Sequence, residues 1–79
     1  MARVLLFGRL SDVAGWRERD VACASISALR ARLAEEDEVL GEALGGPGVQ
    51  VALDQVLTRG DAGLTATSEV AFLPPMSGG

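Results

Sequence analysis

The chain has 79 residues, which fit one small domain, and 48% of them are apolar, so it is compact rather than disordered. It contains seven Arg, no Lys and no His. Without His it lacks the commonest general base and metal ligand, and a single Cys excludes an internal disulfide framework. A formal charge of −4 disfavours nucleic acids and anionic membranes as partners, and so small a chain favours a carrier, subunit or binding module over an independent enzyme.

The first elements are strands. Alternating apolar residues predict a strand over residues 3–10, with Val4 and Leu6 on the inner face. Residues 11–16 are expected to form a turn, and residues 19–24 a second strand. The two strands together indicate an opening hairpin.

A helix is predicted to begin after Ser25, whose hydroxyl can accept a hydrogen bond from an early backbone N–H. Its apolar residues recur at helical spacing along one stripe: Ile26, Leu29 and Leu33. An acidic run at residues 35–38 is expected to face solvent, with a weak ion pair between Arg32 and Glu36. Residues 39–44 add a short second helical turn before the glycines and proline of residues 45–48.

The remaining elements are short strands. Residues 49–53 alternate and predict a third strand, followed by a turn at residues 54–55 and a strand at residues 56–58. Residues 59–63 are expected to form a loop, and residues 69–73 the last strand.

The element order is β-β-α-β-β with a short terminal strand, which defines the fold class. The connection through the helix is long enough for a crossover, so the first and last strands can pair in parallel. One main helix covering a mixed sheet of four or five strands is the β-grasp, or ubiquitin-like, arrangement of the α+β class. We therefore expect a β-grasp domain over residues 1–73 and an extended C-terminal tail over residues 74–79.

The tail differs in character from a packed domain. Pro74 and Pro75 cannot donate backbone hydrogen bonds, so they end the sheet and favour an extended exit. The six residues 74–79 can reach roughly 20 Å, against an expected radius of gyration of about 12 Å for the domain. Gly78 and Gly79 have no side chains and can enter a narrow tunnel in another protein.

The strand at residues 3–7, the helix at residues 25–30 and the ending at residues 70–79 together resemble the MoaD-like sulfur carriers, the small subunits of molybdopterin synthase. The resemblance covers the whole chain, and Pro-Pro-x-Ser-Gly-Gly after a strand is its specific part. One departure is Ala66-Thr67-Ser68, where relatives tend to carry an Asp-Gly-Asp-like turn. Without Gly this turn must avoid positive φ or be strained.

The resemblance implies a sulfur-transfer cycle on Gly79. A ubiquitin-activating-type enzyme would use ATP to adenylate the terminal carboxylate, and a sulfur-donor protein would convert it into a thiocarboxylate. The large subunit of molybdopterin synthase, in a heterotetramer with this chain, would bind cyclic pyranopterin monophosphate and receive the sulfur. This chain would bind no cofactor itself, and no catalysis is expected from it alone.

The resemblance also implies a partner interface. Phe7, Leu57 and Leu73 would form an outward apolar patch near the root of the tail. The sequence pattern by itself does not decide which way Leu57 faces. Within the tail, Gly78 would thread the partner's tunnel, and the residues before it would contact the partner: Pro74, Pro75, Met76 and Ser77.

Three other functions stay open on the sequence. A thiamine-pathway sulfur carrier would share the fold and the thiocarboxylate. A covalent protein modifier would be attached through Gly79 to lysines of other proteins. A plain interaction domain would carry an inert tail, and its function would survive loss of Gly79.

A location in the cytoplasm is also expected. The chain shows no apolar run long enough to span a membrane, and Met1-Ala2-Arg3-Val4 does not open a signal peptide. A free thiol fits a reducing compartment. Cys23, which shares a strand face with Val21, is expected to pack as a small apolar side chain.

Overall fold

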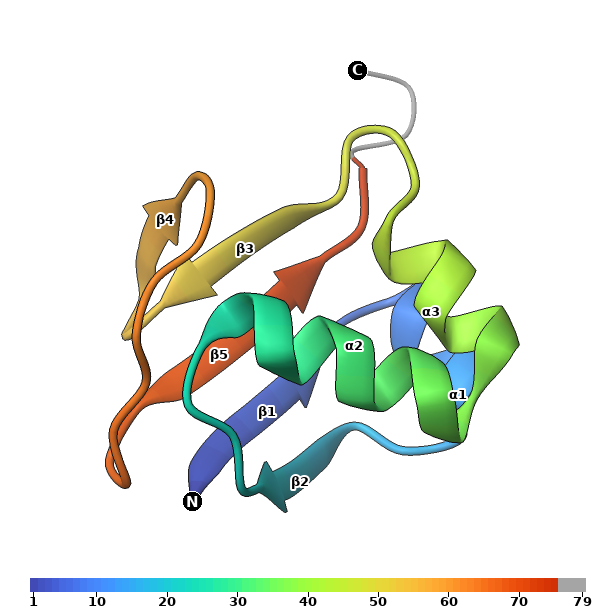
Figure 1. Cartoon of the computed structure of the whole chain (residues 1–79). Helices are drawn as coiled ribbons and strands as arrows, with labels where there is room; N and C mark the ends of the chain where they lie inside the picture. Colours follow the sequence, from blue (N-terminus) through green and yellow to red (C-terminus); the bar gives the residue numbers. More distant parts are fainter. Residues whose placement is uncertain (76–79) are drawn as a thin grey trace.

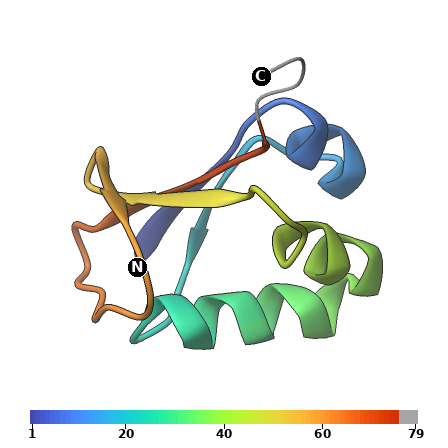
Figure 2. The ribbon, with the colours of Figure 1, turned by 90° about the horizontal axis from the view of Figure 1, so that it is seen from above.

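The computed structural model describes residues 1–75, which form one five-stranded sheet with helices on one face (Figure 1). The elements in chain order are β1 (Ala2–Leu6), α1 (Arg9–Ala14), β2 (Glu18–Val21), α2 (Ile26–Glu36), α3 (Glu38–Leu44), β3 (Gln50–Leu53), β4 (Val56–Thr58) and β5 (Glu69–Leu73). Seen from above, α2 lies as a separate layer along the sheet, and α1 and α3 lie towards the end at which β5 finishes (Figure 2).

The sheet has the order β2-β1-β5-β3-β4. The central strands β1 and β5 pair in parallel, with Val4 opposite Val70 and Leu6 opposite Phe72. The other three pairings are antiparallel. The parallel pairing predicted from the crossover is therefore confirmed.

The core lies between the sheet and α2. Val70 and Phe72 of β5 are fully buried, and so is Val4 of β1. They meet the predicted helical stripe, of which Leu29 and Leu33 are also fully buried. The stripe is confirmed, and so is the cap, because Ser25 Oγ accepts a hydrogen bond from Ala28 N at 3.1 Å.

The predicted first strand was too long, and the predicted turn after it was wrong. β1 ends at Leu6, and Gly8, with φ +55°, breaks the strand before α1 begins. Leu10 still reaches the core, but from α1. A separation of four residues places Leu6 and Leu10 on one face of a strand and equally on one face of a helix, so the pattern could not separate the two.

The predicted opening hairpin is wrong in its connection. β2 spans Glu18–Val21 rather than residues 19–24, and it pairs antiparallel with β1 as expected. The chain reaches it through α1 and the left-handed Gly15, not through a tight turn.

The main helix predicted after Ser25 is α2, and the short helical segment predicted for residues 39–44 is α3, a separate helix that meets α2 at Asp37. This residue has φ −149°, which stops α2, and its carboxylate accepts a hydrogen bond from Leu40 N at 3.1 Å to cap α3. Part of the acidic run thus caps a helix instead of only facing water.

The turn at Ala66-Thr67-Ser68 needs no glycine. Ser68 N donates to Thr65 O at 3.2 Å, and Ser68 Oγ accepts from Thr65 N at 2.8 Å. Within residues 1–75, positive φ in non-glycine residues occurs at Asp54 and Gln55, the predicted turn before β4. The turn therefore avoids positive φ, one of the two outcomes left open by the sequence.

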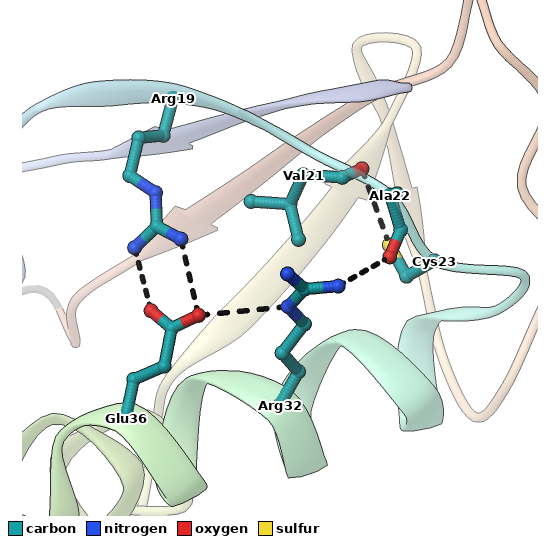
Figure 3. A network of polar contacts seen from close by, with 6 residues as sticks. All are labelled: Arg19, Val21, Ala22, Cys23, Arg32 and Glu36. Carbon is teal, nitrogen blue, oxygen red and sulfur yellow. Dashed lines mark hydrogen bonds and ion pairs between the residues drawn. The ribbon is translucent and has the colours of Figure 1, made fainter.

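A polar network joins the edge strand β2 to α2 (Figure 3). Arg19 donates to both carboxylate oxygens of Glu36, at 2.8 and 3.2 Å, and Arg32 contacts the same carboxylate at 3.5 Å, as expected from their spacing. The guanidinium of Arg19 also lies 5.1 Å from the ring centre of Trp16. These contacts, chiefly the hydrogen bonds from Arg19, hold the pKa of Glu36 below its ordinary value.

Cys23 lies half-buried at the edge of the core, and its thiol donates to Val21 O at 3.7 Å. Burial raises the pKa of this thiol, which disfavours the reactive thiolate. The packing role expected for Cys23 agrees with this position. No helix within residues 1–75 is both long and apolar enough to cross a bilayer.

The loop after β4 is fastened to the start of α2 by Asp61. Its carboxylate accepts hydrogen bonds from Ser27 N at 2.9 Å and from Ser27 Oγ at 2.8 Å. These bonds, the one from the backbone first, hold the pKa of Asp61 below its ordinary value.

Replacing Asp61 by Ala is expected to lower the Tm at neutral pH and to have progressively less effect below about pH 4. Because the pKa of Asp61 is depressed in the folded protein, the stability it contributes is present above the unfolded-state pKa of about 3.9 and is lost as the pH falls through the lower folded-state value. Thermal unfolding followed by circular dichroism measures the effect. Asp61→Asn, which keeps an acceptor oxygen and does not titrate, is the control. An equal Tm difference at neutral and acid pH would contradict the assignment.

Candidate functional site

An apolar row crosses four strands on the face of the sheet that the helices leave uncovered. The registers place Leu5 opposite Ala71, Ala71 opposite Ala52, and Ala52 opposite Leu57. The neighbours of these residues along β1 and β5 point into the core, so the row points outward. Leu57, whose facing the sequence left open, therefore lies on the outer face, with 60% of its surface exposed.

A second, shorter row lies beside the first and nearer to the tail. Phe7 N donates to Phe72 O at 3.2 Å, which holds Phe7 against β5 one position beyond the last register pair and beside Leu73. Leu73 is half-buried, and Phe7 is 46% exposed. We call the six apolar residues of the two rows the outer patch: Leu5, Phe7, Ala52, Leu57, Ala71 and Leu73.

The exit of the chain is fixed by two glycines, one on each side. A Cβ on Gly8 would lie 3.2 Å from Pro74 Cγ, and a Cβ on Gly48 would lie 2.6 Å from Pro75 Cβ. Both glycines have positive φ, +55° and +81° respectively, in which a side chain would be strained. Pro74 and Pro75 therefore leave the sheet between the loop after β1 and the loop before β3 (Figure 1).

This exit, which we call the tail root, lies directly beside the outer patch. Leu73 is the last paired residue of β5, opposite Gln50, and the two prolines follow at once. Pro74 is half-buried and Pro75 exposed. The remaining predicted site residues, Met76, Ser77, Gly78 and Gly79, lie outside the described residues.

An open hollow of about 420 Å³ adjoins the tail root on the helical side. Leu10 and Val13 of α1 and Val39 of α3 line it together with the two prolines. Its wall is mainly apolar, and it is open to solvent rather than enclosed, unlike the pockets that bury small molecules.

The chemistry of the described residues is limited. Within residues 1–75, no group of three or more His, Cys, Asp or Glu side chains could hold a metal ion, and the chain has no His to act as a base. The thiol of Cys23 is held at the edge of the core and is bonded to a backbone carbonyl. What the arrangement can do is present an apolar surface, and the point at which the chain leaves the sheet, to another protein.

Gly8 and Gly48 are functional residues that local sequence patterns do not assign. Each stands out in the sequence, because Gly8 interrupts an apolar strand and Gly48 closes a run of glycines around a proline. Their closeness to Pro74 and Pro75 depends on the sheet order, which a reading of the local pattern does not provide.

This chain is similar in sequence to proteins that are already known. A model of the ThiS family matches residues 4–79. The molybdopterin synthase sulfur carrier subunit of Escherichia coli (strain K12) is 33% identical over 81 residues, a match that spans 100% of both chains.

Solved structures agree on the fold. The solution structure of small archaeal modifier protein 1 from Methanosarcina acetivorans matches with a TM-score of 0.87 and 20% identity over 99% of this chain and 95% of that one. The corresponding protein from Haloferax volcanii matches with a TM-score of 0.78 and 25% identity over 99% and 98%. The predicted ubiquitin-like β-grasp fold is confirmed, and because the family match extends over nearly the whole chain, the protein belongs to the ThiS family.

Proposed function

We propose that this protein is the sulfur-carrier subunit of a molybdopterin synthase and that it carries sulfur as a thiocarboxylate on Gly79. The observation that carries the proposal is the outer patch joined to the tail root, which presents the tail on an apolar docking surface. Full-length identity of 33% to the sulfur carrier subunit of E. coli supports it.

Activation of Gly79 needs a second protein that binds ATP. A carboxylate is a poor electrophile, because its charge repels nucleophiles. An oxygen of the Gly79 carboxylate would attack the α-phosphorus of ATP, and pyrophosphate would leave. A sulfur nucleophile from a donor protein would then add to the acyl carbon of the adenylate, and AMP would leave. Where this nucleophile is a persulfide, the product is an acyl disulfide, and a thiol then attacks its outer sulfur. The inner sulfur stays on Gly79 as the thiocarboxylate, and the donor and the thiol are left joined as a disulfide.

Transfer of the sulfur would take place on the large subunit of the synthase. That subunit would hold cyclic pyranopterin monophosphate and supply the acid and base groups, since this chain has no His. A dithiolene contains two sulfurs, so two charged carriers are used for each product.

The residues of this chain would then have separate tasks. The outer patch docks on the large subunit and, at another time, on the activating enzyme. Pro74 and Pro75 would set the point at which the tail leaves the sheet, and the glycines at its end would allow it to enter a narrow site.

A second function, attachment to lysines of other proteins, is favoured by one specific observation. Two solved structures of small archaeal modifier protein 1 share this fold over almost the whole chain. In that case Gly79 would be joined to an amine instead of exchanging oxygen for sulfur, and conjugates of higher mass would appear on a blot for this protein.

Removal of Gly79, or addition of one residue after it, is expected to abolish sulfur transfer and to leave the Tm unchanged. The reason is that the proposed chemistry takes place on one terminal carboxyl group, and the core is built from residues of the described part of the chain. Intact mass spectrometry of the protein, incubated with the activating enzyme, ATP and the sulfur donor, measures the exchange of one oxygen for one sulfur. Fragmentation that assigns this change to Gly79 distinguishes it from oxidation elsewhere. Full transfer by an extended, uncleaved protein would overturn the proposal.

Leu57→Glu is expected to weaken binding to the large subunit by at least about tenfold, because a charge would replace an apolar contact at a desolvated interface. Val56→Glu is the matched control. Val56 is the neighbour of Leu57 on β4 and is similarly exposed, at 66%, but it pairs with Leu53 and so lies on the other face of the strand. Isothermal titration calorimetry measures both affinities. Equal weakening by the two variants would exclude the outer patch as the docking surface.

Gly48→Ala is expected to impair sulfur transfer more than Gly60→Ala. Both glycines have positive φ, +81° and +77°, so either change costs about 1–2 kcal/mol of backbone strain. Only the Cβ at position 48 meets Pro75, whereas nothing lies within 4 Å of a Cβ at position 60. Tm values and single-turnover transfer rates separate the shared loss of stability from displacement of the tail root. Identical transfer rates for the two variants would show that the space between Gly48 and Pro75 is not needed for sulfur transfer.

A further inference from the structure

The arginines of this chain fall into two groups. Three of them form ion pairs with carboxylates of the described residues: Arg3, Arg19 and Arg32. The other four form no ion pair within residues 1–75: Arg9, Arg17, Arg30 and Arg59. In a protein with a net charge of −4, arginines that no carboxylate of the described part of the chain neutralises are available to an external anion.

Arg30 and Arg59 line one hollow of about 380 Å³ at the end of the β3–β4 ribbon. We call it the arginine hollow. Among the described residues, every other one that lines it is uncharged, so the two arginines share the space without an Asp or Glu. Two like charges placed together in one hollow repel each other, and a bound anion relieves this repulsion.

Arg30 is held in place by its own packing. Its Nη1 donates to Leu44 O at 3.1 Å, and its guanidinium lies 5.5 Å from the ring centre of Phe72. A guanidinium has five N–H donors, and the bond to Leu44 O uses one of them. The remaining donors are therefore presented by a side chain whose position is already fixed, which lowers the entropy lost on binding.

The acid nearest to Arg59 in the sequence is engaged elsewhere. Asp61, two residues after Arg59, is bonded to the backbone and the hydroxyl of Ser27 at the start of α2. Its carboxylate is thus held by α2 and forms no ion pair with Arg59.

The arginine hollow is continuous with the proposed docking surface. Leu57 belongs to the outer patch and also lines the hollow. Gly48 lines the hollow as well, and it is the residue against which Pro75 lies at the tail root. The hollow thus borders the outer patch at Leu57 and the tail root at Gly48, so a protein docked on both would reach its rim.

We propose that the arginine hollow receives an acidic segment, an Asp or Glu carboxylate, of the large subunit that takes up the tail. This inference rests on the proposed function. A carboxylate can accept two parallel N–H bonds from one guanidinium and a further bond from the second, which fixes the orientation of the docked protein as well as adding affinity. The ion pair between this carboxylate and the two arginines would lie beside the apolar contact made by Leu57, so the two would act together in docking.

The test measures the affinity of the large subunit for the full chain by isothermal titration calorimetry at two salt concentrations. Arg59→Glu is expected to raise the Kd at least about tenfold at about 0.1 M salt, and Arg59→Lys, which keeps the charge, by only about twofold to threefold. Raising the salt to about 0.5 M is expected to reduce the difference in Kd between Arg59→Glu and the unaltered protein. The reason is that salt screens exposed charges and shortens the distance over which they interact to below about 10 Å.

Arg3→Glu is the matched control. It changes the net charge by the same amount, but Arg3 lies at the start of β1, away from the tail root, and already faces Glu18 and Asp20. Its Kd is expected to stay within about twofold of that of the unaltered protein. Tm values confirm that the variants are folded.

The outcomes separate the inference from the function on which it rests. If Leu57→Glu abolishes binding and Arg59→Glu leaves the Kd unchanged, the inference is overturned and the proposed function stands. Equal weakening by Arg59→Glu and Arg3→Glu also overturns the inference, because net charge alone would explain it. If the unaltered protein does not bind the large subunit, both are overturned.

Discussion

The parallel pairing of β1 with β5 is the constraint on which the other features depend. It brings residues from the two ends of the described chain to the centre of the sheet, with Leu6 opposite Phe72. On the inner side this pairing places Phe72 against the helical layer, where Arg30 lies over its ring. On the outer side the same register sets Phe7 beside Leu73. The core, the outer patch and the direction in which the chain leaves the domain thus follow from a single ladder of hydrogen bonds.

The periodic parts of this fold could be predicted from the sequence, because each has a signal within a few residues. The stripe that begins at Ile26, the cap at Ser25 and the alternation of β5 were each correct. α1 could not be predicted, because its apolar residues are few and the position of Leu10 fits the alternation of a strand as well as the spacing of a helix. Asp37 was read as surface charge, although a residue that ends one helix and caps the next must have a short polar side chain.

For the site, the sequence identified residue types but not their neighbours. Leu57 could be assigned to the outer face only through its register with Ala52, which depends on where the turn at Asp54 and Gln55 is placed. Contacts of Pro75 with Gly48, and of Arg30 with Phe72, join segments far apart in the chain. No pattern of local spacing contains such information, so these contacts appear only when the sheet order is known.

β5 is the last of the described strands to be synthesised, yet it occupies the middle of the sheet. Until it is inserted, β1 and β3 have no common neighbour, and the apolar row that crosses them does not exist as a surface. A nascent or truncated chain therefore cannot display the row, however much of its helical layer has formed. A protein that bound the complete row would therefore bind only chains in which β5 has already taken its place in the sheet.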